Sequence, residues 1–181
     1  MRIGHIELDK PLALAPMEDV TDRAFRLICK EQGADLLYTE FASSEALIRD
    51  VGTTLRKIQI TDAERPIAVQ IFGGDSGSME AAAAVAEQAE PDFIDVNCGC
   101  WVKKVARREA GAGLLKDLAK FESVVRSVIR GTHLPVTVKT RLGWDADSIV
   151  ILDVARMLEQ AGVAGLAVHC RNRAQGHRGA A

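Results

Sequence analysis

The sequence FIDVNCGC, residues 93–100, begins as an apolar run and ends in polar residues that include Asn97 and Cys100. Short runs of this kind recur along the chain, and each ends in polar or turn residues. The others lie at residues 12–17, 36–41, 67–73, 135–142 and 165–171. Runs of about four to eight residues with such boundaries are typical of buried β-strands, so we expect six strands.

Helix-like segments separate most of these runs. Residues 22–32, 78–90, 117–130 and 148–160 carry apolar side chains at helical spacing or are rich in alanine, and glycines follow several of them. Alternating strands and helices predict a parallel sheet with right-handed crossovers. The polar interval 49–65 has no such pattern, so we expect it to be loop and irregular structure.

Polar residues near the ends of the expected strands favour a barrel over an open sheet. Gln70, Asn97, Lys139 and His169 each lie on the face whose other residues are mostly small or polar. In a barrel these side chains would converge at one mouth, where active sites of this fold lie. Ala-Pro-Met at residues 15–17 replaces the glycine-rich turn of a dinucleotide-binding domain, which argues against that fold. The expected fold class is α/β, of the TIM (β/α)8-barrel type.

Composition places the chain among soluble globular domains. It has 181 residues, 48% of them hydrophobic and 27% charged, which is within the usual size of one domain. The net charge of -2 means that any contact with a polyanion has to be local. Residues 101–108 hold four cations and no acid, and residues 160–181 contain arginines and no acid. Without a secretory leader or an apolar run of about 18 residues, we expect a cytoplasmic protein with no membrane segment.

The four cysteines are expected to be free thiols, because the expected compartment is reducing. A zinc site made of Cys98, Cys100, Cys170 and His169 conflicts with the usual ligand spacing, since one residue separates Cys98 from Cys100. We therefore expect no metal. Cys100 could donate a proton as the thiol or attack as the thiolate. Neighbouring cations favour the thiolate, whereas a packed site favours the thiol.

The polar residues expected at the mouth suit a planar heterocycle and an anion. Lys139 is a fixed cation able to hold negative charge on a reduced flavin ring or an enolate. Gln70 and Asn97 offer amide donors and acceptors for ring carbonyl and N–H groups. His169, with two arginines close behind it, suits a phosphate.

Six short motifs follow one another along the chain: APM at 15–17, VQIFG at 69–73, DVNCGC at 95–100, GAG at 111–113, VKTRLGW at 138–144 and VH at 168–169. In order and spacing they resemble the tRNA-dihydrouridine synthases, most closely the bacterial B-type branch. The resemblance extends from residue 11 to residue 179. It implies a TIM barrel with a helical C-terminal domain, FMN as cofactor, NADPH as reductant and tRNA as partner. The implied activity is the reduction of a uridine flipped out of tRNA to 5,6-dihydrouridine.

The resemblance also implies roles for individual residues. Cys100 would be the general acid that protonates C5 of the uracil, while the flavin supplies hydride to C6. Five residues would contact FMN: Pro16 and Met17 against the ring, Gln70 and Lys139 at its edge, and His169 reaching toward it. Asn97 would help to hold the flavin or the uracil, and Arg141 would contact RNA. The cations facing the RNA backbone would be Lys103, Lys104, Arg107 and Arg108.

Several positions depart from the family pattern. Trp101 stands where the family commonly has proline, Glu109 and Cys170 replace glycines, and His177 and Arg178 replace an aromatic and a small residue. If the backbone at Glu109 needs a positive φ, the side chain costs on the order of 1 kcal/mol or more. These changes bear on the shape of the catalytic loop and not on its identity.

The length of the chain predicts a partial barrel, because an eight-stranded barrel typically needs about 250 residues. We expect residues 1–181 to be a partial catalytic domain, without the last barrel strands and the helical tRNA-binding domain, and to bind FMN poorly by itself. Two alternatives stay open. One is another FMN-dependent barrel oxidoreductase, such as a dihydroorotate dehydrogenase-like enzyme; the other is a non-catalytic RNA-binding fragment with inert thiols. The sequence indicates no oligomeric state.

Overall fold

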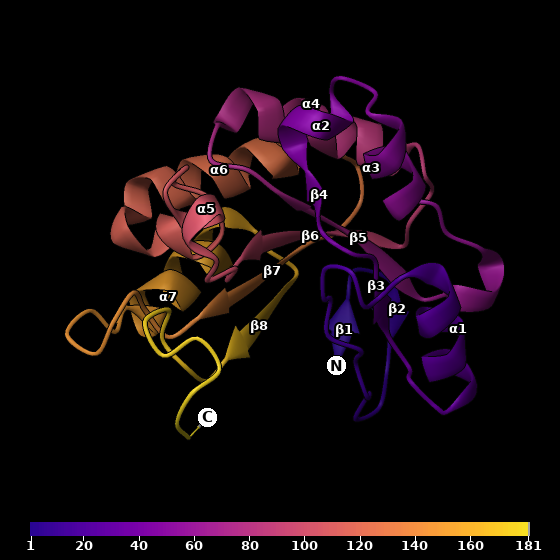
Figure 1. Cartoon of the computed structure of the whole chain (residues 1–181). Helices are drawn as coiled ribbons and strands as arrows, with labels where there is room; N and C mark the ends of the chain where they lie inside the picture. Colours follow the sequence, from indigo (N-terminus) through magenta and orange to yellow (C-terminus); the bar gives the residue numbers. More distant parts are fainter. Residues whose placement is uncertain (181) are drawn as a thin grey trace.

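A parallel sheet forms the centre of the computed structural model, which describes residues 1–180. Its strands are β3 (Leu37–Tyr38), β4 (Ala42–Ser43), β5 (Ile67–Phe72), β6 (Phe93–Cys98), β7 (Val136–Arg141) and β8 (Gly165–His169). They run in the order β3-β5-β6-β7-β8, and β4 also pairs with β5. Every pair in this sheet is parallel. The sheet curves, with helices along its outer side (Figure 1), so the predicted α/β fold with about six parallel strands is confirmed.

The first two expected strands are shorter than predicted. At residues 12–17 the strand is reduced to one parallel bridge between Ala13 and Leu36, since Pro16 has no N–H to extend a ladder. The run at 36–41 contains only β3, and β4 follows directly after it. Tyr38 pairs with Ala68 and Ala42 pairs with Ile71, so one extra residue interrupts the register against β5.

The four predicted helices are confirmed as α1 (Arg23–Glu31), α4 (Ser76–Glu87), α6 (Leu118–Arg130) and α7 (Ile151–Ala161). The side chains of Asp22, Asp75 and Asp117 cap the first three by accepting from backbone N–H groups of the first turn. Helix α7 ends at Gly162, whose φ of 88° is the left-handed conformation that glycine adopts readily. In the described part of the chain, no helix combines the length and the apolar character needed to cross a bilayer.

Short elements that the sequence pattern did not predict fill the connections. The interval 49–65, expected to be irregular, contains α3 (Gly52–Lys57) and the 3-10 helix η1 (Asp62–Glu64). The others are β1 (Arg2–Ile3), β2 (Ile6–Glu7), α2 (Ser44–Leu47), α5 (Lys103–Ala106) and the 3-10 helix η2 (Gly111–Lys116). These elements are too short to give a clear periodic pattern in the sequence.

The two faces of the central strands differ in polarity. Ile71, Val96 and Val138 point outward and are buried with residues of α4 and α6 in the main hydrophobic core. Because successive side chains alternate between the faces of a strand, Gln70 and Lys139 lie on the inner face. This polar inner face leads to the candidate active site.

Candidate active site

A buried chain of hydrogen-bonded side chains runs along the inner face of the sheet toward Cys100. Asp95 on β6 accepts from Gln70 Nε2 at 2.7 Å and from the hydroxyl of Thr137 on β7. Gln70 Oε1 accepts from Asn97 Nδ2 at 2.9 Å. Asn97 Oδ1 in turn accepts from the backbone N–H of Cys100 at 2.9 Å. These hydrogen bonds therefore link the inside of the sheet to the loop that carries the thiol of Cys100.

The donors and acceptors of these hydrogen-bonded side chains can be assigned in one consistent order. The backbone N–H groups of Gly99 and Cys100 can only donate, so Asn97 must present its oxygen to them. The nitrogen of Asn97 then faces the oxygen of Gln70, whose own nitrogen faces the carboxylate of Asp95. All three side chains are buried, where an unpaired polar group is costly. The hydrogen bonds therefore fix the start of the Cys100 loop.

A cavity of about 400 Å³ opens at the carboxyl ends of the strands. Seven of the residues predicted from the sequence line it: Pro16, Met17, Asn97, Cys100, Lys139, Arg141 and His169. The strand register explains this gathering, because Asn97 pairs with Lys139 and Arg141 pairs with His169 on neighbouring strands. The polar residues borne by the strands thus meet at one mouth, where a barrel places its active site.

Three other predicted site residues do not line the cavity. Gln70 is completely buried and bonded to Asp95 and Asn97, so it supports the site from within the protein. Lys103 and Lys104 lie in α5, after the Cys100 loop, and both are exposed. The two lysines therefore face solvent and not the inside of the cavity.

Arg141 lines the cavity, but backbone carbonyl groups hold its guanidinium. Nε donates to the oxygen of Gly99 at 2.8 Å, and Nη1 donates to the oxygen of Gly176 at 2.8 Å. The residue is only 3% exposed. These contacts tie the Cys100 loop to the segment after β8, which favours a positioning role for Arg141 over direct contact with RNA.

Burial has the largest effect on the protonation of the titratable groups in the cavity. It raises the pKa of the Cys100 thiol, although the charge of Arg141 acts in the opposite direction. It lowers the pKa of Lys139. Burial, with the charges of Arg141 and Lys139, lowers the pKa of His169 to about 4, so its imidazole is neutral near pH 7. Arg171 Nη1 lies 3.0 Å from His169 Nε2 and can only donate, which puts the imidazole proton on Nδ1.

Glu18 is a cavity residue that the sequence analysis missed. It follows Met17 at the cavity wall, and its carboxylate forms an ion pair with Lys57 of α3. Lys57 Nζ also lies 3.4 Å from the carboxylate of Glu40. The position next to Met17 was the signal that could have drawn attention to Glu18. Its partner could not be found in the same way, because Lys57 lies in the interval expected to be irregular.

Trp101 and His177 form another part of the cavity wall. Trp101 Nε1 donates to His177 Nε2 at 3.2 Å, and the two rings meet edge to face with centroids 5.6 Å apart. Both stand at positions where the sequence departs from the family pattern. Glu109, a third such position, has a φ of 55°, the left-handed conformation considered for it.

The four residues weighed as zinc ligands do not form a group close enough to share an ion. In residues 1–180, the group of acidic, histidine or cysteine side chains that meets this condition is Glu18, Asp19 and Glu40. Lys57 already provides a positive charge to two of these carboxylates. Cys98 is buried in the hydrophobic core, away from the cavity lining.

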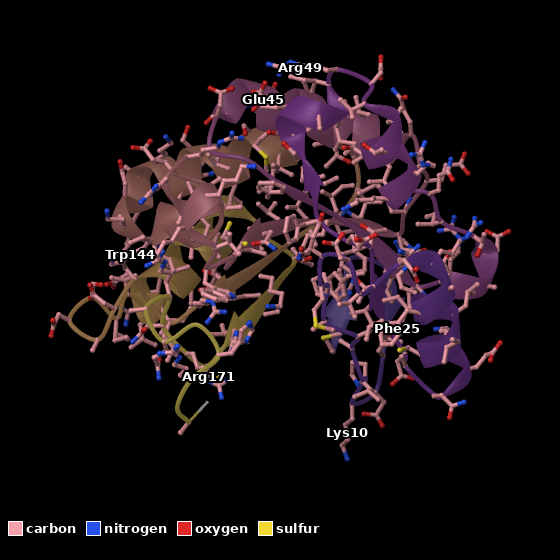
Figure 2. The ribbon with its side chains drawn as sticks, viewed as in Figure 1. Lys10, Phe25, Glu45, Arg49, Trp144 and Arg171 are labelled. Atoms are coloured by element: carbon pink, nitrogen blue, oxygen red, sulfur yellow. The ribbon has the colours of Figure 1, made fainter. Side chains whose placement is uncertain are left out.

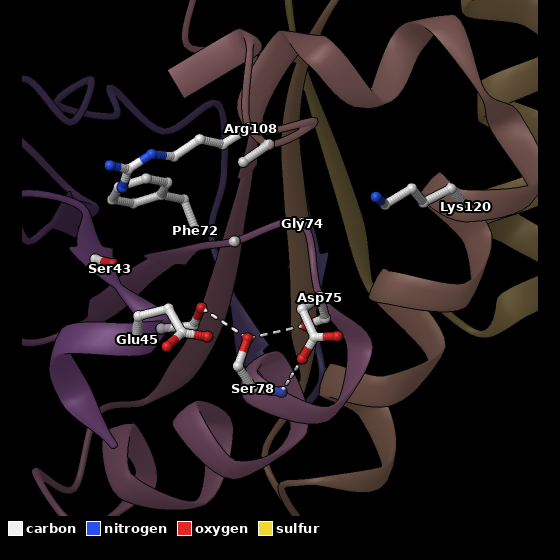
Figure 3. Close-up of a pocket in the computed structure, with 11 residues that line it drawn as sticks. Ser43, Glu45, Phe72, Gly74, Asp75, Ser78, Arg108 and Lys120 are labelled. Atoms are coloured by element: carbon white, nitrogen blue, oxygen red, sulfur yellow. Dashed lines mark hydrogen bonds between the residues drawn. The ribbon is translucent and has the colours of Figure 1, made fainter. Parts of the chain in front are cut away.

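A second hollow, of about 310 Å³, lies beside the first turn of α4. Figure 3 shows Arg108 and Lys120 on one side of it, and Glu45 and Asp75 on the other. Asp75 already caps α4 by accepting from the N–H of Ser78 at 2.8 Å. Cations and carboxylates both line this hollow, so its charges do not select an anion.

Trp144, in the loop that follows β7, lies within cation–π distance of two cations. Lys116 Nζ is 4.7 Å and Arg173 Cζ is 4.4 Å from the centroid of a Trp144 ring. Figure 2 labels Trp144 and Arg171 on this side of the molecule. The contact between Trp144 and Arg173 holds the segment after β8 in place, and the same segment supplies His177 to the cavity wall.

The curved parallel sheet, its outer helices and the polar cavity at the carboxyl ends of the strands define an α/β protein of the TIM-barrel type, with a candidate site in the usual place for enzymes of that fold. The sequence pattern described as "Dihydrouridine synthase (Dus)" matches residues 13–181. The chain belongs to the dihydrouridine synthase family.

Curated relatives agree with this assignment. The tRNA-dihydrouridine synthase B of Pseudomonas putida is 42% identical over 182 residues, covering 100% of this chain and 54% of the relative. The corresponding protein of Pseudomonas syringae pv. tomato is 41% identical with the same coverage. A probable tRNA-dihydrouridine synthase 1 of Synechocystis is 36% identical, with 100% of this chain and 51% of the relative covered. The chain thus spans about half the length of the curated relatives it matches.

Solved structures share the fold. An old yellow enzyme homologue from Zymomonas mobilis aligns with a TM-score of 0.57 and 12% identity, over 93% of this chain and 71% of that protein. The carboxyl transferase domain of Rhizobium etli pyruvate carboxylase aligns with a TM-score of 0.53 and 19% identity, over 79% of this chain and 22% of that one. The predicted fold class, an incomplete TIM barrel, is confirmed.

Proposed function

We propose that this chain forms part of the catalytic barrel of a flavin-dependent tRNA-dihydrouridine synthase, a cytoplasmic enzyme that reduces uridine in tRNA to 5,6-dihydrouridine. The observation that carries the proposal is the shared cavity, in which the Cys100 thiol meets Asn97, Lys139 and His169. Family membership and the names of the relatives support the same activity. In this proposal, segments outside residues 1–181 complete the barrel and hold the rest of the tRNA.

The residues of the cavity fit FMN. Pro16 and Met17 provide an apolar wall for one face of a flat ring, and Lys139 and Asn97 offer donors to the ring edge. His169, neutral and protonated on Nδ1, offers one further donor. When bound and reduced by NADPH, FMN supplies the hydride that C6 of the uracil accepts.

Cys100 supplies the proton that C5 of the uracil receives. Burial raises the pKa of its thiol, so the group is protonated near pH 7, as a general acid must be. The peptide bond that joins Gly99 to Cys100 is held at both of its polar groups, because Asn97 accepts from the N–H of Cys100 and Arg141 donates to the carbonyl of Gly99. A proton donor fixed in this way needs little reorganisation to react.

The cationic segment after the thiol holds the RNA backbone outside the cavity. Lys103, Lys104, Arg107 and Arg108 are exposed. Within residues 1–180, none of the four forms an ion pair with a carboxylate. A flipped nucleotide needs such contacts to its neighbouring phosphates while the base is in the cavity.

Dihydrouridine formation in tRNA tests the proposal. Residues 1–181 would be joined to the part of the Pseudomonas putida relative that this chain does not cover, and expressed in a strain without its own dihydrouridine synthases. We expect Cys100→Ala to lower the dihydrouridine content by about 100-fold or more. Cys170→Ala is the matched control, because this exposed cysteine does not line the cavity. Equal dihydrouridine content with and without the Cys100 thiol would contradict the proposal.

A further inference from the structure

Trp101 is a large aromatic side chain left exposed at the edge of the cavity. It follows Cys100 directly, lines the cavity, and is 42% exposed. Val102 beside it is 46% exposed. Neither the fold nor the proposed chemistry accounts for two adjacent exposed apolar side chains on a loop that is otherwise firmly held. Such a patch next to a cavity marks a contact surface.

Neighbouring residues hold the indole ring of Trp101 in one orientation. Its Nε1 donates to His177 at 3.2 Å, and the His177 ring meets it edge to face. Gly176 packs against the indole, since a Cβ added at this glycine would lie 3.4 Å from Cε3 of Trp101. Gly176 is itself fixed by Arg141, which donates to its carbonyl at 2.8 Å. A ring that is already immobilised can stack on a ligand with little further loss of entropy.

The residues that follow Trp101 provide charge for a phosphate backbone. Lys103 and Lys104 begin α5 two and three positions later, and both are exposed. No carboxylate within the described range pairs with either lysine. Proteins bind unpaired nucleotides with this combination, an aromatic face for the base and cations for the phosphates.

We propose that Trp101 stacks on an unpaired RNA base adjacent to the nucleotide that enters the cavity. The reacting base has to lie beside Cys100, whereas Trp101 at the edge meets the next base along the strand. A purine offers a larger face than a pyrimidine, so a neighbouring purine binds more tightly. The relation to a reacting nucleotide rests on the proposed function, while the binding of an unpaired base does not.

The composition of the chain allows a direct test by fluorescence. The chain has two tryptophans, so Trp144→Phe leaves Trp101 as the only indole. This variant of the 181-residue chain would be titrated with a single-stranded RNA hexamer of alternating adenosine and uridine. We expect saturable quenching of the fluorescence, with a midpoint that rises with salt concentration. A hexamer of abasic ribose phosphate is the matched control, and we expect it to bind more weakly and to leave the emission unchanged.

Substitutions separate stacking from charge. Trp101→Leu should weaken binding of the hexamer, measured by anisotropy of a labelled RNA, by about ten-fold. Trp101→Phe should keep most of the affinity, and Trp101→Gln, which also lacks an aromatic face, replaces the leucine variant if that one does not fold. Lys104→Gln should reduce the salt dependence and preserve the quenching at saturation.

Three results would overturn the inference: no binding of the hexamer, binding without quenching, or affinity that is the same for the leucine and phenylalanine variants as for Trp101. Failure of the proposed function is a separate observation. It would appear as absence of dihydrouridine in the joined protein, while the titration with RNA still showed quenching.

Discussion

Replacing Arg26 by methionine should destabilise the protein strongly, because this arginine belongs to a buried ion pair. The side chains of Arg26 on α1 and Glu64 in η1 are 1% and 0% exposed. Arg26 Nε donates to Glu64 at 2.7 Å, and Nη1 donates to the carbonyl oxygen of Thr21 at 2.9 Å. Thr21 exchanges two hydrogen bonds with the backbone of Met17, which lines the cavity. The pair thus supports both the fold and the first loop of the site.

The expected loss follows from the charge that remains. In Arg26→Met the carboxylate of Glu64 stays buried without its partner, which costs about 3–5 kcal/mol. A domain of this kind is stable by about 5–15 kcal/mol, so the loss is a large part of the total. The matched control is Arg49→Met. Arg49 pairs with Glu45 on the surface (Figure 2). The two side chains are 71% and 49% exposed, and such a pair contributes only about 0.3–0.5 kcal/mol.

Urea unfolding followed by circular dichroism measures both losses. The double variant Arg26→Met/Glu64→Leu should recover most of the stability, because it removes the unpaired charge together with its partner. If Arg26→Met and Arg49→Met differ by less than about 1 kcal/mol, the reasoning is refuted. A double variant less stable than Arg26→Met alone would refute it as well.

Three further predictions concern single positions. Burial raises the pKa of Asp95 from 3.8 to about 6. The stability contributed by its neutral form is therefore fully present below about pH 4 and is lost as the pH rises through 6. Urea unfolding of Asp95→Asn should lack this loss of stability, and equal pH profiles for the variant and the parent protein would contradict the prediction. Gly131→Ala should lower the midpoint temperature of thermal unfolding, because the added Cβ would lie 2.2 Å from the carbonyl oxygen of Glu80 in α4. An unchanged midpoint temperature would show that α4 and α6 can separate without cost. At Glu109, where φ is 55°, glycine should leave the free energy of unfolding unchanged or raise it by up to about 1 kcal/mol, whereas valine should lower it. Equal effects of glycine and valine in urea unfolding would mean that the backbone there is not strained.

The elements predicted well are those with enough residues to show a period. β6 and β7 have six residues each and α6 has thirteen, and their apolar faces repeat clearly. The prediction of a full strand at residues 12–17 was wrong, because Pro16 has no N–H to donate to a ladder. The hydropathy of the segment does not reveal this. Helix α3 has six residues, none of them fully buried, and only Leu55 packs against the core, so it is too short to show an apolar period. Tertiary contacts such as the pairing of Lys57 with Glu18 hold it instead.

The same distinction applies to the site. Asn97, Lys139 and His169 were predictable because alternation along a strand fixes which face a residue occupies, and parallel strands end at one edge. His177 lies in a segment without regular structure, placed by the hydrogen bond from Arg141 to Gly176. No local pattern encodes that long-range contact, so the sequence could mark the position as unusual but could not place it at the cavity.

The protonation of Cys100 shows how the structure decides a question that local sequence leaves open. In the sequence, the cations shortly after Cys100 favour a thiolate. Lys103 and Lys104, however, lie in α5 outside the cavity lining, whereas the thiol itself is packed within the site. Burial raises its pKa, and the opposing charges of Arg141 and Lys139 do not cancel that effect. The thiol therefore keeps its proton near neutral pH, which suits a general acid and not a nucleophile.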